Sequence, residues 1–230
     1  MSIKDGIWIV PLRERFDGTA NLIHSWIMKN PLARLVAIID KDDPQRRDLI
    51  ELCEYRSVEW IWAGDKNTTS EKINQAVKEF PGERFYGFLA NDIEIQTEGA
   101  LTALAENCPF MGLSYCDDSI HGQNLPTYPC VSGALVETLG WWAFPLAAHN
   151  GVDIYLQECA NVAGGCKYLP EHHFYHRRES EKRAEPDSVA ERRKAFAARD
   201  MEAGSSWYLQ GVREVNLQRV KEAWEQMHVR

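Results

Sequence analysis

Four short, largely apolar segments alternate with helix-like segments over the first 95 residues, and this alternation constrains the fold more than any other feature. The apolar segments are residues 7–12, 35–39, 58–62 and 85–89. The segments with apolar positions at helical spacing are residues 18–29, 45–55 and 70–80. Apolar runs of this kind are typical of parallel strands, which helical crossovers bury on both faces. We therefore predict an α/β fold with a mostly parallel central sheet and helices on both faces.

The pattern changes beyond residue 105. The expected elements there are two strands, a helix and an extended segment, at residues 110–115, 128–136, 151–163 and 168–175. From residue 187 onward the pattern is helical and polar, with a break at the glycine and two serines of 204–206. We therefore expect a domain spanning residues 1–186 and a helical extension, residues 187–230, that packs on it.

The charge distribution limits the choice of ligand. The 230-residue chain has a formal net charge of −8. Residues 1–170 hold 14 Lys and Arg against 23 Asp and Glu, whereas residues 171–230 hold 12 against 11. An acidic body opposes long-range attraction of nucleic acid. To bind an anionic nucleotide it needs a divalent cation or local basic side chains.

The six cysteines include no CxxC pair, and the chain shows neither a signal peptide nor an apolar run near the ~18 residues of a membrane span. These features predict reduced thiols in a cytoplasmic protein without a membrane span.

Polar residues follow the predicted strands where each strand ends. The four clusters are residues 13–15, 40–43, 64–67 and 91–92. In parallel sheets, ligands bind beyond the carboxyl ends of the strands. We expect these clusters to converge on one site.

Asp92 lies in the sequence Asn91-Asp92-Ile93-Glu94, after the fourth strand. A carboxylate there can coordinate a hard divalent cation, which in turn neutralises a diphosphate. A solvated turn or a helix cap is an equally good interpretation of this motif taken alone.

Three histidines lie close together at His172, His173 and His176. Histidines can bind zinc, but the flanking residues favour an extended segment, with His172 and His176 on one face and His173 on the other. We favour one histidine that assists a cation held by Asp92 over a zinc site; exposed loop histidines are the alternative.

Asp153 follows a glycine at the start of a predicted helix. It can be a helix-capping carboxylate, which the free amides of the helix start stabilise. It can also be a general base that deprotonates an acceptor hydroxyl. Its place between Trp141-Trp142 and the histidines favours the second interpretation slightly.

Charged residues after the first two strands suit a nucleotide. Arg13 and Arg15 can pair with phosphate, and surface salt bridges are the alternative. Asp40 and Asp42 can accept hydrogen bonds from a base or a ribose, or they can cap the next helix.

Lys72 and Asn74, on the helix after the third strand, can reach a nucleotide, although solvation is the default expectation for both. Trp141 and Trp142 can stack on a sugar or base, and core packing is the safer interpretation of each.

Several nucleotide and hydrolase motifs are absent from the sequence. There is no GxGxxG after the first strand, no GxxxxGK[ST] and no GxSxG. A dinucleotide fingerprint, a phosphate-binding P-loop and an α/β-hydrolase nucleophile are therefore disfavoured.

Taken together, the chain resembles the A-type-fold glycosyltransferases, the family-2-like nucleotide-sugar transferase superfamily, over roughly residues 5–190. The segments that carry the resemblance are residues 9–15, 39–44, 88–94, 132–136, 151–153 and 168–176. The resemblance implies a catalytic domain that binds a nucleotide-sugar donor, with a UDP-sugar favoured.

The resemblance also implies where the metal lies. Asp92 stands in the family's acidic metal motif, so that it would hold Mn²⁺ or Mg²⁺ on the donor diphosphate. His176 would be the late ligand of the metal or the pyrophosphate. The family's usual acid-x-acid motif is Asn-Asp-Ile-Glu here, and Asn91 is placed with the donor-binding residues.

The nucleoside pocket implied by the resemblance is formed by Pro11, Arg13 and Asp40 or Asp42. Asp153 would be the general base, and a base opposite the leaving group predicts inversion of the anomeric centre.

Three hypotheses follow. The first is sugar transfer to an acceptor hydroxyl of a carbohydrate, small molecule or protein, or of a modified nucleic-acid base. The second is a catalytically silent protein that binds a nucleotide sugar. The third is a non-enzymatic interaction module whose partner surface is the helical extension.

Overall fold

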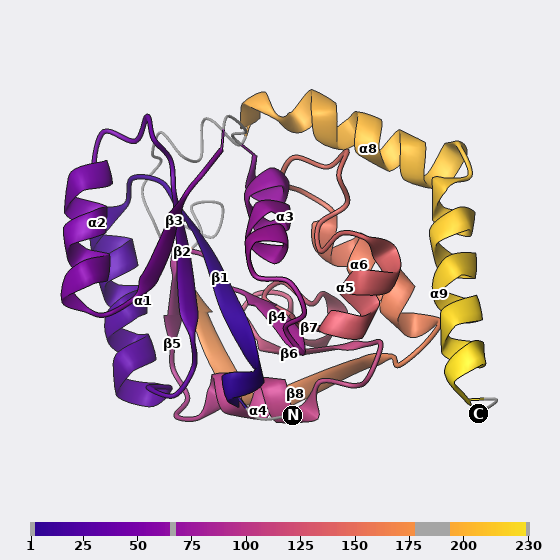
Figure 1. Ribbon diagram of the computed structural model, residues 1–230, viewed down its shortest axis with the longest axis horizontal. Helices are drawn as coiled ribbons and strands as arrows, with labels where there is room; N and C mark the ends of the chain where they lie inside the picture. Colours follow the sequence, from indigo (N-terminus) through magenta and orange to yellow (C-terminus); the bar gives the residue numbers. More distant parts are fainter. Residues whose placement is uncertain (1–2, 65–67, 178–193, 229–230) are drawn as a thin grey trace.

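The chain forms an α/β structure, shown in Figure 1 as a computed structural model that describes residues 3–64, 68–177 and 194–228. Its strands are β1 (Gly6–Leu12), β2 (Leu35–Ile39), β3 (Glu59–Trp62), β4 (Phe85–Phe88), β5 (Ile93–Ile95), β6 (Leu113–Asp117), β7 (Cys130–Ser132) and β8 (Cys166–His176). Its α-helices are α1 (Phe16–Lys29), α2 (Arg46–Tyr55), α3 (Thr69–Glu79), α4 (Ala100–Asn107), α5 (Gly133–Leu139), α6 (Val152–Asn161), α8 (Ala197–Leu209) and α9 (Val212–His228). Among these described helices, none is long and apolar enough to cross a membrane.

The described strands form one mixed sheet in the order β3-β2-β1-β4-β7-β6-β8-β5. The first four strands of the chain are parallel, and β6 is parallel to β8. β7 is antiparallel to both β4 and β6, and β5 is antiparallel to β8. Because the two reversals at β7 cancel, β1, β2, β4, β6 and β8 all end at the same edge of the sheet. The predicted α/β fold is confirmed.

Helices cover both faces of the sheet, with α1 and α2 on one side and α3, α5 and α6 on the other (Figure 1). Along β1, Trp8, Val10 and Leu12 point into the core beneath α1, α2 and α4. Ile7 and Ile9 point into the core on the opposite face. All five side chains are at most 2% exposed, which explains why this segment is apolar throughout.

The C-terminal helices α8 and α9 lie on the outside of α5 and α6 (Figure 1). Trp207 of α8 is fully buried, and its ring contacts those of Trp141, Phe144 and Tyr155 at centroid distances of 4.9 to 6.2 Å. Val220 of α9 is buried in the same core. The two helices therefore share the hydrophobic core of one sheet face.

The strand predicted at residues 128–136 is wrong in its second half, because the chain leaves β7 at Ser132 and enters α5 at Gly133. A Cβ atom on residue 133 would lie only 2.0 Å from the carbonyl oxygen of Glu83, so close packing at this turn requires glycine. A short buried apolar run suits a strand and a helix equally, and periodicity alone cannot separate them. The other late strand, β6, begins at Leu113 rather than at residue 110.

The helix break predicted at residues 204–206 is also wrong, because α8 continues through them. Ala203, Ser206 and Trp207 are buried on one side of α8, and this packing outweighs the low helix propensity of glycine and serine. The two C-terminal helices separate instead at Gly211, which has a positive φ of 73°. Strand β5 and helix α4 were not predicted from the sequence.

Candidate active site

Five of the described strands that end at the same sheet edge, namely β1, β2, β4, β6 and β8, bring polar side chains together there. The residues at or just beyond these strand ends are Arg13, Asp40, Asp92, Asp118 and His176. They form two groups, one beside α3 and one beside β8.

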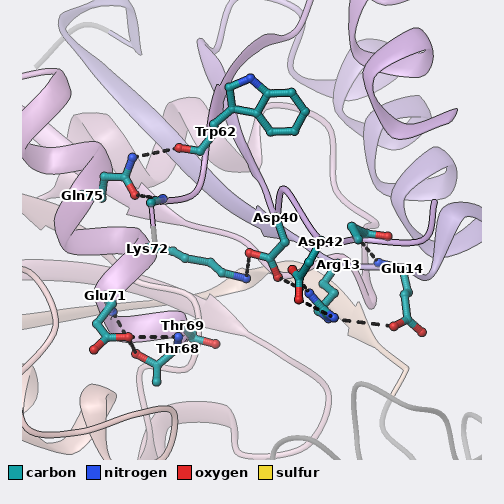
Figure 2. Close-up of polar contacts among 12 residues, drawn as sticks. Arg13, Glu14, Asp40, Asp42, Trp62, Thr68, Thr69, Glu71, Lys72 and Gln75 are labelled. Atoms are coloured by element: carbon teal, nitrogen blue, oxygen red, sulfur yellow. Dashed lines mark hydrogen bonds and ion pairs between the residues drawn. The ribbon is translucent and has the colours of Figure 1, made fainter. Parts of the chain in front are cut away.

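The first group, here called the Asp40 cluster, consists of Arg13, Asp40, Asp42 and Lys72 (Figure 2). Arg13 Nη1 lies 2.9 Å from Asp40 Oδ2 and 2.8 Å from Asp42 Oδ1. Lys72 Nζ lies 2.6 Å from Asp40 Oδ1. The side chains of Asp40 and Lys72 are 1% and 6% exposed, whereas that of Asp42 is 64% exposed. Burial lowers the pKa of Arg13, but the two carboxylates raise it more, so the guanidinium stays charged.

The loop after β1 has an unusual backbone that directs its two arginines. Glu14 and Arg15 both have a φ of 51°, a left-handed conformation that costs non-glycine residues energy. The Glu14 amide donates to Asp43 Oδ2 at 2.7 Å, and Asn91 Nδ2 donates to the Arg13 carbonyl at 3.4 Å. These contacts hold the loop so that Arg13 and Arg15 point to different groups.

Pro11 lies in β1, two residues before Arg13. The Ile9 carbonyl accepts from the Leu89 amide at 3.0 Å, and the pairing of β1 with β4 ends there. The backbone of Pro11, two residues after Ile9, faces β4 as well, but beyond the point where the β1–β4 pairing ends. The missing N–H of proline therefore removes no hydrogen bond between the two strands.

The second group is centred on Asp92. Arg15 Nη1 lies 2.8 Å from Asp92 Oδ2, and His176 Nε2 lies 3.8 Å from the same oxygen. The antiparallel register of β5 and β8, which pairs Ile93 with His176, brings them side by side. The Arg177 amide also donates to the Asp92 carbonyl at 2.8 Å. Asp92 Oδ1 is buried and has no hydrogen-bond partner among the described residues.

Asp118, which was not among the predicted site residues, lies on the other side of His176. Its Oδ2 is 3.9 Å from His176 Nδ1. Its Oδ1 accepts from the backbone amides of Ile120, His121 and Gly122 at 3.0, 2.6 and 3.3 Å. A fixed carboxylate behind a histidine is the arrangement that orients metal-ligating histidines. The acidic pair Asp117-Asp118, at the end of β6, is the sequence signal that points to it.

The electrostatics of this group favour a charged histidine between two carboxylates. Burial works against all three charges, but the mutual contacts outweigh it. The His176 ring and the Arg15 guanidinium lower the pKa of Asp92. The His176 ring and backbone amides lower the pKa of Asp118. The two carboxylates raise the pKa of His176 above its ordinary value.

A cavity of about 270 Å³ beside Asp92 and His176, here called the Asp92 pocket, is also lined by Asp153. Its walls include the rings of Phe88, Tyr128 and Trp142. Phe88 lies 5.8 Å from Tyr128 and 5.6 Å from Trp142 between ring centroids, so the walls form one aromatic cluster. The pocket thus combines a mainly apolar interior with two carboxylates in its lining, those of Asp92 and Asp153.

Asp153 is the second residue of α6, whose N-cap Gly151 has a φ of 81°. Its Oδ1 accepts from the Ile154 amide at 3.0 Å. Burial nevertheless raises the pKa of Asp153, in the direction opposite to that of Asp92. A carboxylate that holds a proton more tightly is better matched to proton abstraction near neutral pH.

Other predicted residues lie outside these two groups. Asn74 accepts from the amides of Trp142 and Ala143, both at 2.9 Å, and donates to the Ala143 carbonyl at 2.6 Å. Its polar atoms therefore hold a loop rather than join the Asp40 cluster. Of the predicted cluster at 64–67, residues 65–67 lie outside the described residues.

The three histidines of β8 do not converge. His172 Nε2 lies 3.8 Å from Glu171, and His173 Nδ1 lies 3.3 Å from Asp117. Only His176 lies beside Asp92, and within the described ranges no group of three His, Cys, Asp or Glu side chains is arranged to hold a metal ion.

The donor set that fits a divalent cation here is therefore a pair. Asp92 has a buried carboxylate oxygen available, and His176 Nε2 is directed toward the same carboxylate. A hard cation such as Mg²⁺ is commonly held by one or two protein ligands, with phosphate oxygens and water completing the shell. The residues fit a cation that is shared with a diphosphate.

No protein-family model and no curated protein sequence matches this chain. Solved structures do. The mannosyltransferase PcManGT of Pyrobaculum calidifontis, in complex with GDP-Man and Mn²⁺, is 10% identical with a TM-score of 0.60, over 95% of this chain and 73% of that one. Glucosyl-3-phosphoglycerate synthase of Mycobacterium tuberculosis, in complex with Mn²⁺, UDP and glucosyl-3-phosphoglycerate, is 12% identical with a TM-score of 0.61, over 87% and 78%. S. aureus TarS in complex with UDP is 13% identical with a TM-score of 0.58, over 95% and 80%.

These likenesses establish the fold. The chain has the A-type fold of the nucleotide-sugar glycosyltransferases, as its sequence predicted. The solved neighbours bind UDP or a GDP-sugar, two of them together with Mn²⁺.

Proposed function

We propose that this protein transfers a sugar from a nucleotide-diphosphate donor, with a UDP-sugar favoured, to the hydroxyl group of an acceptor. The observation that carries the proposal is the Asp92 pocket. Asp92, His176 and Asp153 come from three distant parts of the chain and line one cavity. Two of them suit a cation and a diphosphate, and the third suits proton abstraction.

The Asp40 cluster is the proposed nucleoside end of the donor site. The carboxylate of Asp42 is exposed and can accept from a base N–H or a ribose hydroxyl. Asp40 and Lys72 are buried beneath it and fix the position of Arg13. Pro11 precedes this cluster on β1 and completes the predicted nucleoside pocket.

The diphosphate would lie between the two groups, where Arg15 supplies positive charge. His176, which is charged in the metal-free protein, would lose its proton on binding a cation, because imidazole is a metal ligand only in its neutral form. Asp92 and His176 would hold Mn²⁺ or Mg²⁺, which neutralises the negative charge that develops on the departing diphosphate. Arg15 is paired with Asp92 through one carboxylate oxygen, and a guanidinium is also well suited to bind phosphate oxygens.

The transfer step needs one general base. The acceptor hydroxyl gives its proton to the Asp153 carboxylate, and its oxygen forms a bond to the anomeric carbon. The bond from that carbon to the diphosphate oxygen breaks, and the electron pair leaves with the nucleoside diphosphate. A base opposite the leaving group gives inversion of the anomeric centre. A product with retained configuration would remove Asp153 from this role.

The acceptor proposed first is a carbohydrate or another small molecule, since the aromatic rings around the Asp92 pocket suit the apolar face of a sugar. A modified DNA base is the second choice, because its ring can stack in the same way. The net charge of −8 opposes approach of the DNA backbone.

A catalytically silent sugar-nucleotide-binding protein is the alternative function. Two observations favour it: the motif is Asn-Asp-Ile-Glu here rather than the usual acid-x-acid, and Arg15 pairs with one oxygen of Asp92. The two functions differ in turnover, not in binding.

The test is a panel of nucleotide sugars incubated with the protein and Mn²⁺, with release of nucleoside diphosphate measured by chromatography. We expect turnover with one donor and a loss of at least about 10²-fold in Asp92→Ala, because cation-assisted charge stabilisation contributes several kcal/mol. Glu94→Ala is the matched control. Glu94 belongs to the same motif but pairs with Arg177 at 3.2 Å, and its loss should leave turnover within a few-fold. Tight UDP binding without turnover of any donor would favour the silent protein.

A further inference from the structure

The loop of residues 145–150 borders the Asp92 pocket and has no helix or strand of its own. His149 and Asn150 line the cavity directly. The loop leads straight into α6, which begins at Val152 and carries Asp153. The contacts that fix this loop therefore fix the start of α6.

Asp200 of α8 binds this loop from the C-terminal part of the chain. Its Oδ1 accepts from the amides of Ala148 and His149 at 2.7 and 3.0 Å. Its Oδ2 accepts from the amide and the side-chain Nδ2 of Asn150 at 3.1 and 2.8 Å. A carboxylate in the first turn of a helix ordinarily serves the free amides of its own helix. Here the four bonds go to a segment 50 residues earlier in the chain.

The neighbouring Arg199 holds the other end of the same loop. Its Nε donates to the Leu146 carbonyl and its Nη2 donates to the Pro145 carbonyl, both at 3.2 Å. Nη2 also lies 3.1 Å from Glu71 Oε1. Glu71 belongs to the capping box at the start of α3. Arg199 and Asp200, in one turn of α8, thus bind the carbonyls and the amides of the loop, respectively.

The first turn of α3 binds the loop from a second direction. The Ser70 amide donates to the Ala148 carbonyl at 3.2 Å, and Thr69 Oγ1 lies 2.9 Å from His149 Nδ1. Lys72 in the same turn binds Asp40. Figure 2 shows Thr69 and Lys72 on this turn, and Figure 1 shows α8 crossing above α3 and α6. The loop therefore joins α8 to the element that also fixes the Asp40 cluster.

We propose that Asp200 is a positioning residue of the active site: by accepting from three consecutive amides, it holds residues 148–150, and through them Asp153, in place for the transfer step. The proposal rests on the proposed function of Asp153. It makes the first turn of α8 part of the catalytic architecture. Asp200 itself is not among the residues that line the Asp92 pocket.

The test compares Asp200→Ala and Asp200→Asn with Glu202→Ala, which removes an exposed acid from the same helix. We expect kcat to fall about 10²-fold in Asp200→Ala, since small misplacement of a catalytic group costs this much. UDP affinity should change less than twofold, because Asp200 makes no contact with the Asp40 cluster. Asp200→Asn should retain more activity, since its amide oxygen still accepts from Ala148 and His149. Glu202→Ala should match the wild type.

Hydrogen exchange supplies a readout that does not depend on turnover. Asp200→Ala should speed exchange of amides 148–154 while the central strands stay protected, and its circular dichroism should remain that of the wild type. Unchanged exchange at these amides, an unchanged kcat, or equal losses in kcat and UDP affinity would overturn the proposal. If the wild-type protein turns over no donor, the proposed function fails, and exchange at residues 148–150 alone decides whether Asp200 holds the loop.

Discussion

The Asp40 cluster and the Asp92 pocket lie at the same sheet edge and differ in how completely their charges are satisfied. In the Asp40 cluster, the buried carboxylate of Asp40 is held by Arg13 and Lys72 at 2.9 and 2.6 Å. Asp40 Oδ1 and Asp92 Oδ1 are both buried without a hydrogen bond among the described residues, but Asp40 Oδ1 lies against the Lys72 ammonium. The ion pairs of Asp92 with Arg15 and His176 are instead made through its other oxygen, Oδ2. The first group is complete before any ligand binds, and the second is not.

The difference follows from what each group is proposed to do. A group that only orients a nucleoside gains from rigidity, because a preorganised site loses little entropy on binding. A group that binds a cation or takes a proton needs polar atoms that are not already paired within the protein, and burying such atoms lowers the stability of the fold. Changes in the Asp40 cluster should therefore alter stability most, and changes in the Asp92 pocket should alter turnover most.

The largest expected effect comes from Asp153→Asn. Loss of a general base should lower kcat by about 10²–10⁴-fold with UDP affinity unchanged. The same change should raise the melting temperature at neutral pH by about 1–3 °C. Burial raises the pKa of Asp153, so its ionised form destabilises the folded state above that pKa, and Asn removes this penalty. Steady-state kinetics and thermal melts measure the two effects.

Asp17→Asn is the matched control, because Asp17 is the second residue of α1 just as Asp153 is the second residue of α6. Asp17 is exposed, and its loss should leave turnover unchanged and lower stability slightly through the helix dipole. If Asp153→Asn instead behaved like Asp17→Asn, Asp153 would be an ordinary helix-capping residue.

The next effect in size is the loss of stability on changing Lys72 to Met. Removing one partner of a buried ion pair costs about 3 kcal/mol, because it leaves a buried carboxylate less well compensated. For a chain of this size, that is a fall of roughly 6–12 °C in melting temperature. Urea unfolding should show a lower midpoint with an unchanged slope.

Lys78→Met removes a charge from the exposed side of the same helix and should stay within about 0.5 kcal/mol of the wild type. The double variant Lys72→Met with Asp40→Asn should be less destabilised than the sum of the single changes, since both remove one interaction. Equal stability of the Lys72 and Lys78 variants would contradict the role given to the Asp40 cluster.

The parallel half of the sheet was predicted from the sequence because each of its strands is an uninterrupted apolar run that can be recognised without knowledge of its neighbours. The elements beyond residue 105 were predicted less well. The predicted strand at 128–136 became β7 and α5, because the close approach of Gly133 to Glu83 depends on packing that periodicity does not record.

The candidate site was anticipated where strand ends identify it, as with Asp40 and Asp92. The link between Asp92 and His176 came from the family resemblance, since it depends on a long-range register between β5 and β8. Asp118 was missed because the strand before it was predicted to end at residue 115, whereas β6 continues to Asp117. The role proposed for Asp200 could not be predicted from the sequence, because it depends on contacts with backbone amides about 50 residues away.

The smallest expected effect tests whether His176 is charged between Asp92 and Asp118. The two carboxylates raise the pKa of His176 above 6.5, so the folded protein binds this proton more tightly than the unfolded chain. The resulting stability is fully present below the unfolded pKa of 6.5 and is lost as the pH rises through the raised folded pKa. In metal-free protein with chelator, His176→Gln should therefore lower the melting temperature most near pH 5–6, and less as the pH rises.

The expected difference is on the order of 1 kcal/mol, or about 2–4 °C, as for a favourable ion pair near the surface. The lowered pKa values of Asp92 and Asp118 keep both carboxylates ionised across this range, so they do not add a second transition. His173→Gln is the control, because His173 lies 3.3 Å from Asp117 on the same strand but is 47% exposed. A difference between the wild type and His176→Gln that stays flat from pH 5 to 9 would mean that His176 is not charged by its neighbours. Of the groups in the Asp92 pocket, only the carboxylates of Asp92 and Asp153 would then account for its difference from the Asp40 cluster.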